Sequence, residues 1–248
     1  MTSILRGTLA VLAFTSTVWL AAPAAAADDL DVCTKESGDI AIAACTRAIN
    51  SGRYSGRDLA VLLSNRCAEW PDKQENDKAI EDCSQALKLD PANSGALSNR
   101  AQAYHAKGQY DRAIADLNQA IRLSPNDAEL FNNRGLVYED NDQHDRAIED
   151  LNQALRLRPD YASAFKNRGR AYVSKDQYDR AVEDFSQAIR LNPKDAFAFF
   201  GRASSLELKL DLQHALADYK RFAELAPSDP DGPEAIARVT KRLGGRGR

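Results

Sequence analysis

The residues in this sequence that are best able to do chemistry are four cysteines and three histidines. Paired cysteines can form structural disulfides, a redox couple or part of a zinc site, to which histidine also binds. No two cysteines have C-x-x-C spacing, and the histidines lack metal-ligand spacing. We therefore expect structural disulfides, with a redox pair or metal site as the less favoured alternatives, and no cofactor. The residues are Cys33, Cys45, Cys67 and Cys83, and His105, His144 and His214.

Catalytic motifs are absent from the sequence. It has neither a glycine-rich phosphate loop after a strand nor a G-x-S-x-G nucleophile motif. A carboxylate pair formed between neighbouring helices would leave no trace in the sequence. On the motifs alone, we expect a protein that is not an enzyme.

The charge composition argues against nucleic acid as a partner. The chain has 33 Lys and Arg residues against 36 Asp and Glu residues, for a net charge of -3 over 248 residues. Binding to the phosphate backbone needs a concentrated basic surface, which charges so closely balanced do not provide.

Residues 1–27 have the layout of a secretory signal peptide. Arg6 precedes an apolar run from position 9 to 20, and a small-residue stretch with an A-x-A cleavage site ends before Asp28. The apolar run is shorter than the roughly 20 residues that a spanning helix needs. We expect cleavage, no stable membrane insertion afterwards, and a periplasmic or secreted location, where disulfides persist. An uncleaved signal anchor is the alternative.

Several residue types recur every 34 residues through most of the remaining chain. Proline does so at Pro91, Pro125, Pro159, Pro193 and Pro227. Arginine recurs from Arg66 to Arg202 and aspartate from Asp82 to Asp218 with the same step. This register divides the chain into five units, at residues 60–93, 94–127, 128–161, 162–195 and 196–229.

Each unit has the pattern of two helices. In residues 94–127, Leu97, Ala101 and Tyr104 lie on one helical face, and Gly108 interrupts the pattern. A second apolar stripe then runs from Tyr110 to a point before the unit's proline, which cannot continue a helix. A helical hairpin cannot bury its own apolar face, so we expect the units to stack.

The units resemble tetratricopeptide repeats. The resemblance is carried by NRAQAYHAKGQYDRAIADLNQAIRLSP and NRGRAYVSKDQYDRAVEDFSQAIRLNP, and it covers residues 60–229. It implies an all-α, right-handed superhelical solenoid of helix-turn-helix repeats. Departures are Asp176 for the turn glycine, His144 for an aromatic residue and Phe222 for an alanine, so the last unit is expected to pack differently.

The segments that flank the repeats have the character of end caps. Residues 41–49 match the second-helix pattern, so residues 28–59 are interpreted as a degenerate first hairpin. Residues 230–243 are expected to form a capping helix that covers the last apolar face, followed by a flexible tail at 244–248.

Cysteine positions within the hairpins favour one disulfide pairing out of three. Cys67 takes the small-residue position of a first helix, and Cys83 lies near the middle of the second helix that faces it. Cys33 and Cys45 flank the tighter turn of the degenerate hairpin in the same way. We expect these two pairs, each closing a loop of roughly 15 residues and contributing about 3 kcal/mol.

The recurring arginines and aspartates have two interpretations. An arginine row could bind anions, but one aspartate recurs for each arginine. Matched opposite charges at a fixed phase favour a structural ladder of bidentate pairs. Its members include Arg100, Asp116, Arg134, Asp150, Arg168 and Asp184.

Binding specificity is expected on the face of the first helices opposite the packed stripe, because the resemblance implies that this face lines a concave groove. Lys166 and Arg170 could grip a carboxylate, and Phe197 and Phe200 could anchor an apolar side chain. The alternatives are solvated charges and phenylalanines packed against the capping helix. The full set is Gln102, His105, Glu129, Asn132, Lys166, Arg170, Phe197 and Phe200.

These observations favour a non-enzymatic, exported adaptor or scaffold that binds a protein or peptide segment in its groove. One alternative is a structural module that associates with itself as a homo-oligomer. Another is an accessory subunit of a cell-envelope enzyme complex. The sequence leaves the identity of the partner open.

Overall fold

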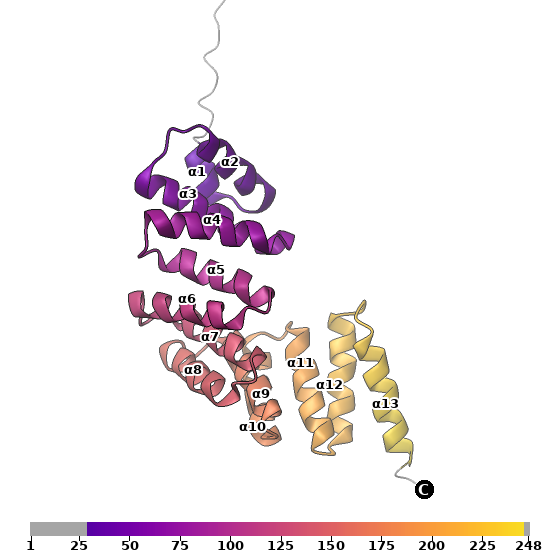
Figure 1. Cartoon of the computed structure of the whole chain (residues 1–248). Coiled ribbons are helices and arrows are strands. Elements are labelled where there is room, and N and C mark those ends of the chain that lie inside the picture. Colours follow the sequence, from indigo (N-terminus) through magenta and orange to yellow (C-terminus); the bar gives the residue numbers. More distant parts are fainter. Residues whose placement is uncertain (1–28, 246–248) are drawn as a thin grey trace, which may run out of the picture.

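The structure is a computed structural model that describes residues 29–245 of the chain, and the expected signal peptide at residues 1–27 lies outside them (Figure 1). Within 29–245 every regular element is a helix, and none is both long and apolar enough to cross a membrane. The helices are α1 (Asp29–Lys35), α2 (Gly38–Asn50), α3 (Gly56–Glu69), α4 (Asn76–Leu89), α5 (Ser94–Ala106), α6 (Tyr110–Leu123), α7 (Ala128–Asp140), α8 (His144–Leu157), α9 (Ala162–Ser174), α10 (Tyr178–Leu191), α11 (Ala196–Leu208), α12 (Leu212–Leu225) and α13 (Asp231–Gly245), with a short 3-10 helix, η1 (Pro71–Lys73).

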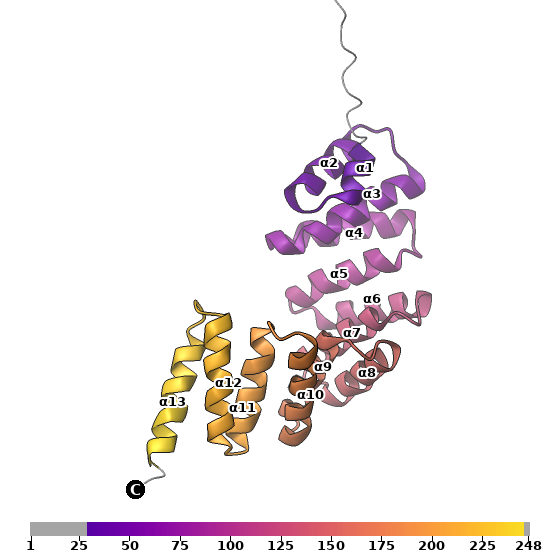
Figure 2. The ribbon, with the colours of Figure 1, turned by 180° about the vertical axis from the view of Figure 1, so that it is seen from behind.

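Consecutive helices pack against one another from α1 to α13, so residues 29–245 form a stack of hairpins. The stack runs from α1 to α6, turns through α7 to α10 and continues to α13 at the opposite end (Figures 1 and 2). The first helices of successive hairpins also touch, α5 with α7, α7 with α9 and α9 with α11. The expected all-α solenoid fold is confirmed.

The turn between the two helices of each repeat requires one residue in the left-handed region. These residues are 34 positions apart, at Gln74 (φ 60°), Gly108 (68°), Asp142 (56°), Asp176 (56°) and Leu210 (65°). Glycine adopts this conformation without steric cost, and aspartate tolerates it better than leucine does. Asp176 therefore preserves the turn that Gly108 makes in its repeat.

Helix boundaries differ from the expected units at both ends of the array. α3 begins at Gly56, four residues before position 60, and it ends where Pro71 opens η1, because proline has no N–H to continue the helical hydrogen bonds. α13 extends to Gly245, so Gly244 and Gly245 complete a helix and are not part of a flexible tail. The rest of that expected tail lies outside the described residues.

Two disulfides lie at the N-terminal end of the stack, and they have the pairing that the sequence analysis favours. One joins Cys33 in α1 to Cys45 in α2, and the other joins Cys67 in α3 to Cys83 in α4. All four cysteines are buried. Each disulfide therefore ties together the two helices of one hairpin.

An arginine clamp recurs through the array. Each of five arginines donates two hydrogen bonds, of 2.6 to 2.9 Å, to the aspartate sixteen residues later on the second helix of its own hairpin. The pairs are Arg66 with Asp82, Arg100 with Asp116, Arg134 with Asp150, Arg168 with Asp184 and Arg202 with Asp218.

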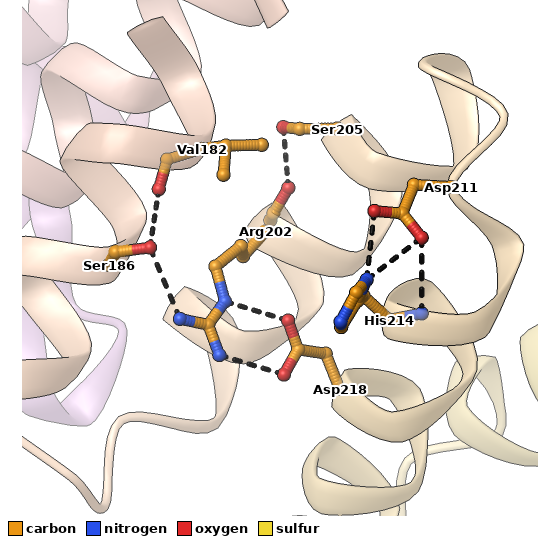
Figure 3. A network of polar contacts seen from close by, with 8 residues as sticks. Val182, Ser186, Arg202, Ser205, Asp211, His214 and Asp218 are labelled. Carbon is orange, nitrogen blue, oxygen red and sulfur yellow. Dashed lines mark hydrogen bonds and ion pairs between the residues drawn. The ribbon is translucent and has the colours of Figure 1, made fainter. Parts of the chain in front are cut away.

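A third hydrogen bond extends each clamp to the preceding hairpin. The remaining guanidinium nitrogen donates to a polar side chain of that hairpin's second helix, over 2.6 to 3.1 Å. Figure 3 shows this arrangement for Arg202, which contacts Ser186 on α10 as well as Asp218 on α12. The other acceptors are Thr46, Ser84, Asn118 and Asn152.

Pairing with the aspartates favours the charged form of the clamp's guanidinium groups. Hydrogen bonding to Asp150 raises the pKa of Arg134, and hydrogen bonding to Asp116 does the same for Arg100. The aspartates are largely buried, Asp150 being 7% exposed. Removing one arginine would leave a carboxylate without its partner in a poorly solvated position.

We expect Arg134→Ala to lower the free energy of unfolding by about 3–5 kcal/mol, because it strands the buried Asp150 carboxylate. Arg156→Ala is the matched control, since Arg156 is exposed and bonds only to Gln153 of its own helix. The control should change stability by no more than about 0.5 kcal/mol. Denaturant unfolding followed by circular dichroism measures both, and similar losses in the two variants would contradict a structural role for the clamp.

Candidate functional site

The first-helix face, formed by α5, α7, α9 and α11, carries two hollows. The one between α9 and α11, called here the apolar hollow, encloses about 420 Å³. It is lined by Lys166, Asn167, Arg170, Val173, Phe185, Phe197, Phe200, Gly201 and Ser204. Four residues expected in a groove, two basic and two aromatic, are therefore brought together in one place.

Aromatic rings supply most of the apolar wall. Phe185 is buried beneath Gly201, whereas Phe197 is 62% exposed at the start of α11. Phe200 packs on Phe222 and Tyr219, with ring centroids 4.9 and 5.5 Å away. Phe222, the residue that departs from the repeat pattern, therefore contacts Phe200 and, with ring centroids 6.2 Å apart, Phe197 as well, while most of the Phe197 side chain stays exposed to solvent.

Both cations at the rim of the apolar hollow already have partners. Lys166 Nζ lies 2.7 Å from Asp195 Oδ2, and Arg170 forms an ion pair with Asp140. Each cation is thus offset by a nearby carboxylate. The basic pair lies where the sequence suggested. An acidic ligand would have to compete with Asp195 and Asp140 for these two cations.

The second hollow, called here the polar hollow, lies between α5 and α7 and encloses about 380 Å³. It is lined by Ser94, Gly95, Ser98, Asn99, Gln102, Asp127, Glu129, Leu130 and Asn133. The Asp127 side chain accepts a hydrogen bond from the backbone N–H of Glu129 and so caps α7. No basic side chain of residues 29–245 forms an ion pair with Asp127 or Glu129.

Two of the expected groove residues line neither hollow and have structural contacts. His105 Nε2 lies 2.6 Å from Asp140 Oδ2, and the same carboxylate pairs with Arg170, so α5, α7 and α9 are linked. Asn132 is only 5% exposed, and its side-chain oxygen accepts a hydrogen bond from Asn167. Asn132 is therefore part of the scaffold and is not offered to a ligand.

A cluster that the sequence analysis did not anticipate joins the capping helix to the last repeat. Glu207 of α11 is buried and accepts hydrogen bonds from Arg238 and Arg242 of α13. The Tyr219 hydroxyl of α12 donates to the same carboxylate at 3.0 Å. The sequence pattern gives only a weak signal for this cluster, because Glu207 has the phase of a groove residue and its two arginine partners lie beyond the repeats.

Burial raises the pKa of Tyr219 to about 12, and the hydrogen bond to Glu207 acts in the same direction. The hydrogen bond from Arg238 lowers the pKa of the Glu207 carboxyl. Both effects keep the cluster as a charged carboxylate and a neutral phenol.

The described part of the chain offers few groups for metal binding or thiol chemistry. Residues 29–245 contain no group of three or more His, Cys, Asp or Glu side chains that could hold a metal ion. The four cysteines are consumed by the disulfides.

Comparison with protein families agrees with the repeat geometry. Tetratricopeptide repeat models match residues 134–200 and 83–115, and a TPR repeat model matches residues 101–142. The chain belongs to the tetratricopeptide repeat family. No curated protein matches its sequence.

Solved structures of other TPR proteins share the fold. MamA is 25% identical with a TM-score of 0.57, over 68% of this chain and 93% of that chain. YrrB, described as a TPR protein with an unusual peptide-binding site, is 21% identical with a TM-score of 0.57, over 79% and 97%. PilW, a type IV pilus biogenesis factor, is 23% identical with a TM-score of 0.69, over 75% and 86%. At these identities, the likeness to YrrB and PilW concerns the fold alone.

The Tyr219 cluster predicts an alkaline loss of stability. A folded-state pKa of about 12 lies above the ordinary value of 10.0, so the stabilisation is present below pH 10 and is lost as the pH rises toward 12. The loss should approach about 2–3 kcal/mol, and Tyr219→Phe should remove this pH dependence. Tyrosinate absorbance with denaturant unfolding at each pH tests the prediction, which fails if wild type and variant respond alike.

The floor of the apolar hollow predicts an unusual response to alanine. A Cβ atom at Gly201 would lie 2.4 Å from Phe185 Cζ. We expect Gly201→Ala to destabilise the fold by about 1–2 kcal/mol, although glycine to alanine inside a helix normally stabilises by about 1 kcal/mol. Gly95→Ala is the control, because its Cβ would meet only Asn93 Oδ1 at 3.4 Å. Thermal unfolding measures the stability of both variants. A stabilised Gly201→Ala would contradict the prediction, because it would mean that the Phe185 ring moves aside at little cost.

Proposed function

We propose that this TPR protein is an adaptor that binds a segment of a partner protein along its first-helix face. The observation that carries the proposal is the apolar hollow with Phe197 62% exposed at its edge. A large exposed ring beside a concave apolar wall supplies the kind of anchor that dominates binding energy at protein interfaces. No side chain of the clamps, the disulfides or the Glu207 cluster lines the apolar hollow.

The adaptor is proposed to act outside the cytoplasm, in the periplasm or as a secreted protein. Support comes from the signal-peptide layout of residues 1–27 and from the two disulfides at the N-terminal end. Disulfides persist in oxidising compartments and are rare where thiols are kept reduced. The proposed role is binding and not catalysis.

Site-specific photo-crosslinking tests the proposal in cells of the native host. A benzophenone amino acid replaces Phe197 in one variant and Arg122, an exposed residue of the second helix α6, in the control. We expect a partner protein to crosslink at position 197 and not at position 122. The additional substitution Gly201→Ala, which crowds the hollow through Phe185, should reduce the yield at position 197.

Two outcomes would overturn groove binding. Identical products from positions 197 and 122 would indicate non-specific contact. Crosslinks only to a second copy of this chain would favour the self-associating module in place of the adaptor. Fractionation of the same cells checks export, since an adaptor retained in the cytoplasm would contradict the proposed location.

A further inference from the structure

We propose that the bound segment is extended and carries a basic residue and a large apolar residue about six positions apart. The basic residue enters the polar hollow and the apolar residue enters the apolar hollow. This inference rests on the proposed function, because it specifies the chemistry of a segment bound to the first-helix face.

The apolar hollow selects for a large apolar side chain because of its walls. Val173, Phe185 and Phe200 are its apolar sides, and the exposed Phe197 ring extends one edge. Its volume of about 420 Å³ is enough for one aromatic or branched aliphatic side chain with neighbouring backbone. Lys166 and Arg170 add little net charge here, since Asp195 and Asp140 offset them.

The polar hollow selects for a cation because two carboxylates and no lysine or arginine line it. Asp127 and Glu129 carry two carboxylates to its wall, and neither forms an ion pair within the described residues. Gln102 and Ser98 offer further oxygen atoms to an ammonium or guanidinium group. The two hollows therefore differ in chemistry, so a segment can occupy both only if its side chains are patterned.

The spacing follows from the packing of the first helices. The polar hollow lies between α5 and α7 and the apolar hollow between α9 and α11, two helix steps apart. Packed helices are about 8–10 Å apart, which gives about 16–20 Å between the hollows. An extended chain rises about 3.3 Å per residue, so about five or six residues bridge this distance.

The surface between the hollows favours polar residues in the middle of the segment. Asp140 of α7 hydrogen-bonds to His105 of α5 and forms an ion pair with Arg170 of α9, so its carboxylate already has partners on both neighbouring first helices. A strongly charged residue of either sign would have to compete with one of these contacts. Small polar residues would cross it without breaking them.

Synthetic peptides test the inference by isothermal titration calorimetry on the purified chain from residue 28 onward. The probe is a twelve-residue peptide of Ser, Thr and Gln with Lys and Phe separated by five residues, blocked at both ends to remove terminal charges. Control peptides replace Lys by Glu, replace Phe by Ser, or leave one residue between Lys and Phe. We expect each control to bind at least about tenfold more weakly than the probe.

A charge exchange links the effect to one residue. Glu129→Lys is chosen because Glu129 is exposed, whereas Asp127 caps α7 and its loss would disturb the helix. This variant should weaken the probe and restore binding of the Lys-to-Glu peptide. Phe197→Ser should weaken every peptide that contains Phe and leave the circular dichroism spectrum unchanged.

Each outcome separates this inference from the proposed function. The proposed pattern of one basic and one apolar residue would be wrong if the probe and the short-spaced peptide bound equally, or if Glu129→Lys had no effect. If no peptide binds while a partner still crosslinks at position 197, the inference fails and the adaptor function stands. If neither is observed, both are wrong.

Discussion

The hydrogen bonds of five arginines hold the architecture together. Each guanidinium binds an aspartate of its own hairpin with two nitrogens and a polar side chain of the preceding hairpin with the third, as Arg134 does with Asp150 and Asn118. The planar fork of arginine makes the bidentate contact directional, which a lysine could not do. Because the clamp spans two hairpins, it sets the spacing and rotation of each repeat relative to the last. The position of every first helix, and so of both hollows, depends on it.

The ends of the array lack one neighbour, and different chemistry replaces it. At the N-terminal end two disulfides close the first two hairpins, and Arg66 reaches back to Thr46 of the degenerate hairpin as the other arginines reach back to their predecessors. At the C-terminal end the buried Glu207 binds α13 through Arg238 and Arg242. A stack of repeats is stable only if its terminal apolar faces are covered. Disulfides hold the terminal hairpins together at one end, and a carboxylate cluster holds the covering helix α13 at the other.

The charges on the first-helix face explain why an apolar anchor is favoured over a carboxylate grip. Lys166 and Arg170 look like free cations in the sequence, yet Lys166 is paired with Asp195, which caps α11, and Arg170 with Asp140 at the end of α7. Exposed or half-exposed ion pairs contribute little to stability, but they do cancel the field that would attract an acidic ligand. Asp127 and Glu129, which form no ion pair within residues 29–245, line the other hollow. The face is therefore acidic at one hollow and apolar at the other.

The sequence by itself determined the repeat, its helices and the partners of the clamp within each hairpin, because a 34-residue period repeats the same local contacts and shows them five times. It also favoured the disulfide pairing, since hairpin register brings Cys67 opposite Cys83. Contacts between repeats were decided only by the tertiary structure. Asn132 is buried, Lys166 is paired and Glu207 binds the cap, although all three have the phase of groove residues. Helical phase shows which face a residue lies on, whereas its exposure depends on the superhelical stacking that brings other repeats to it.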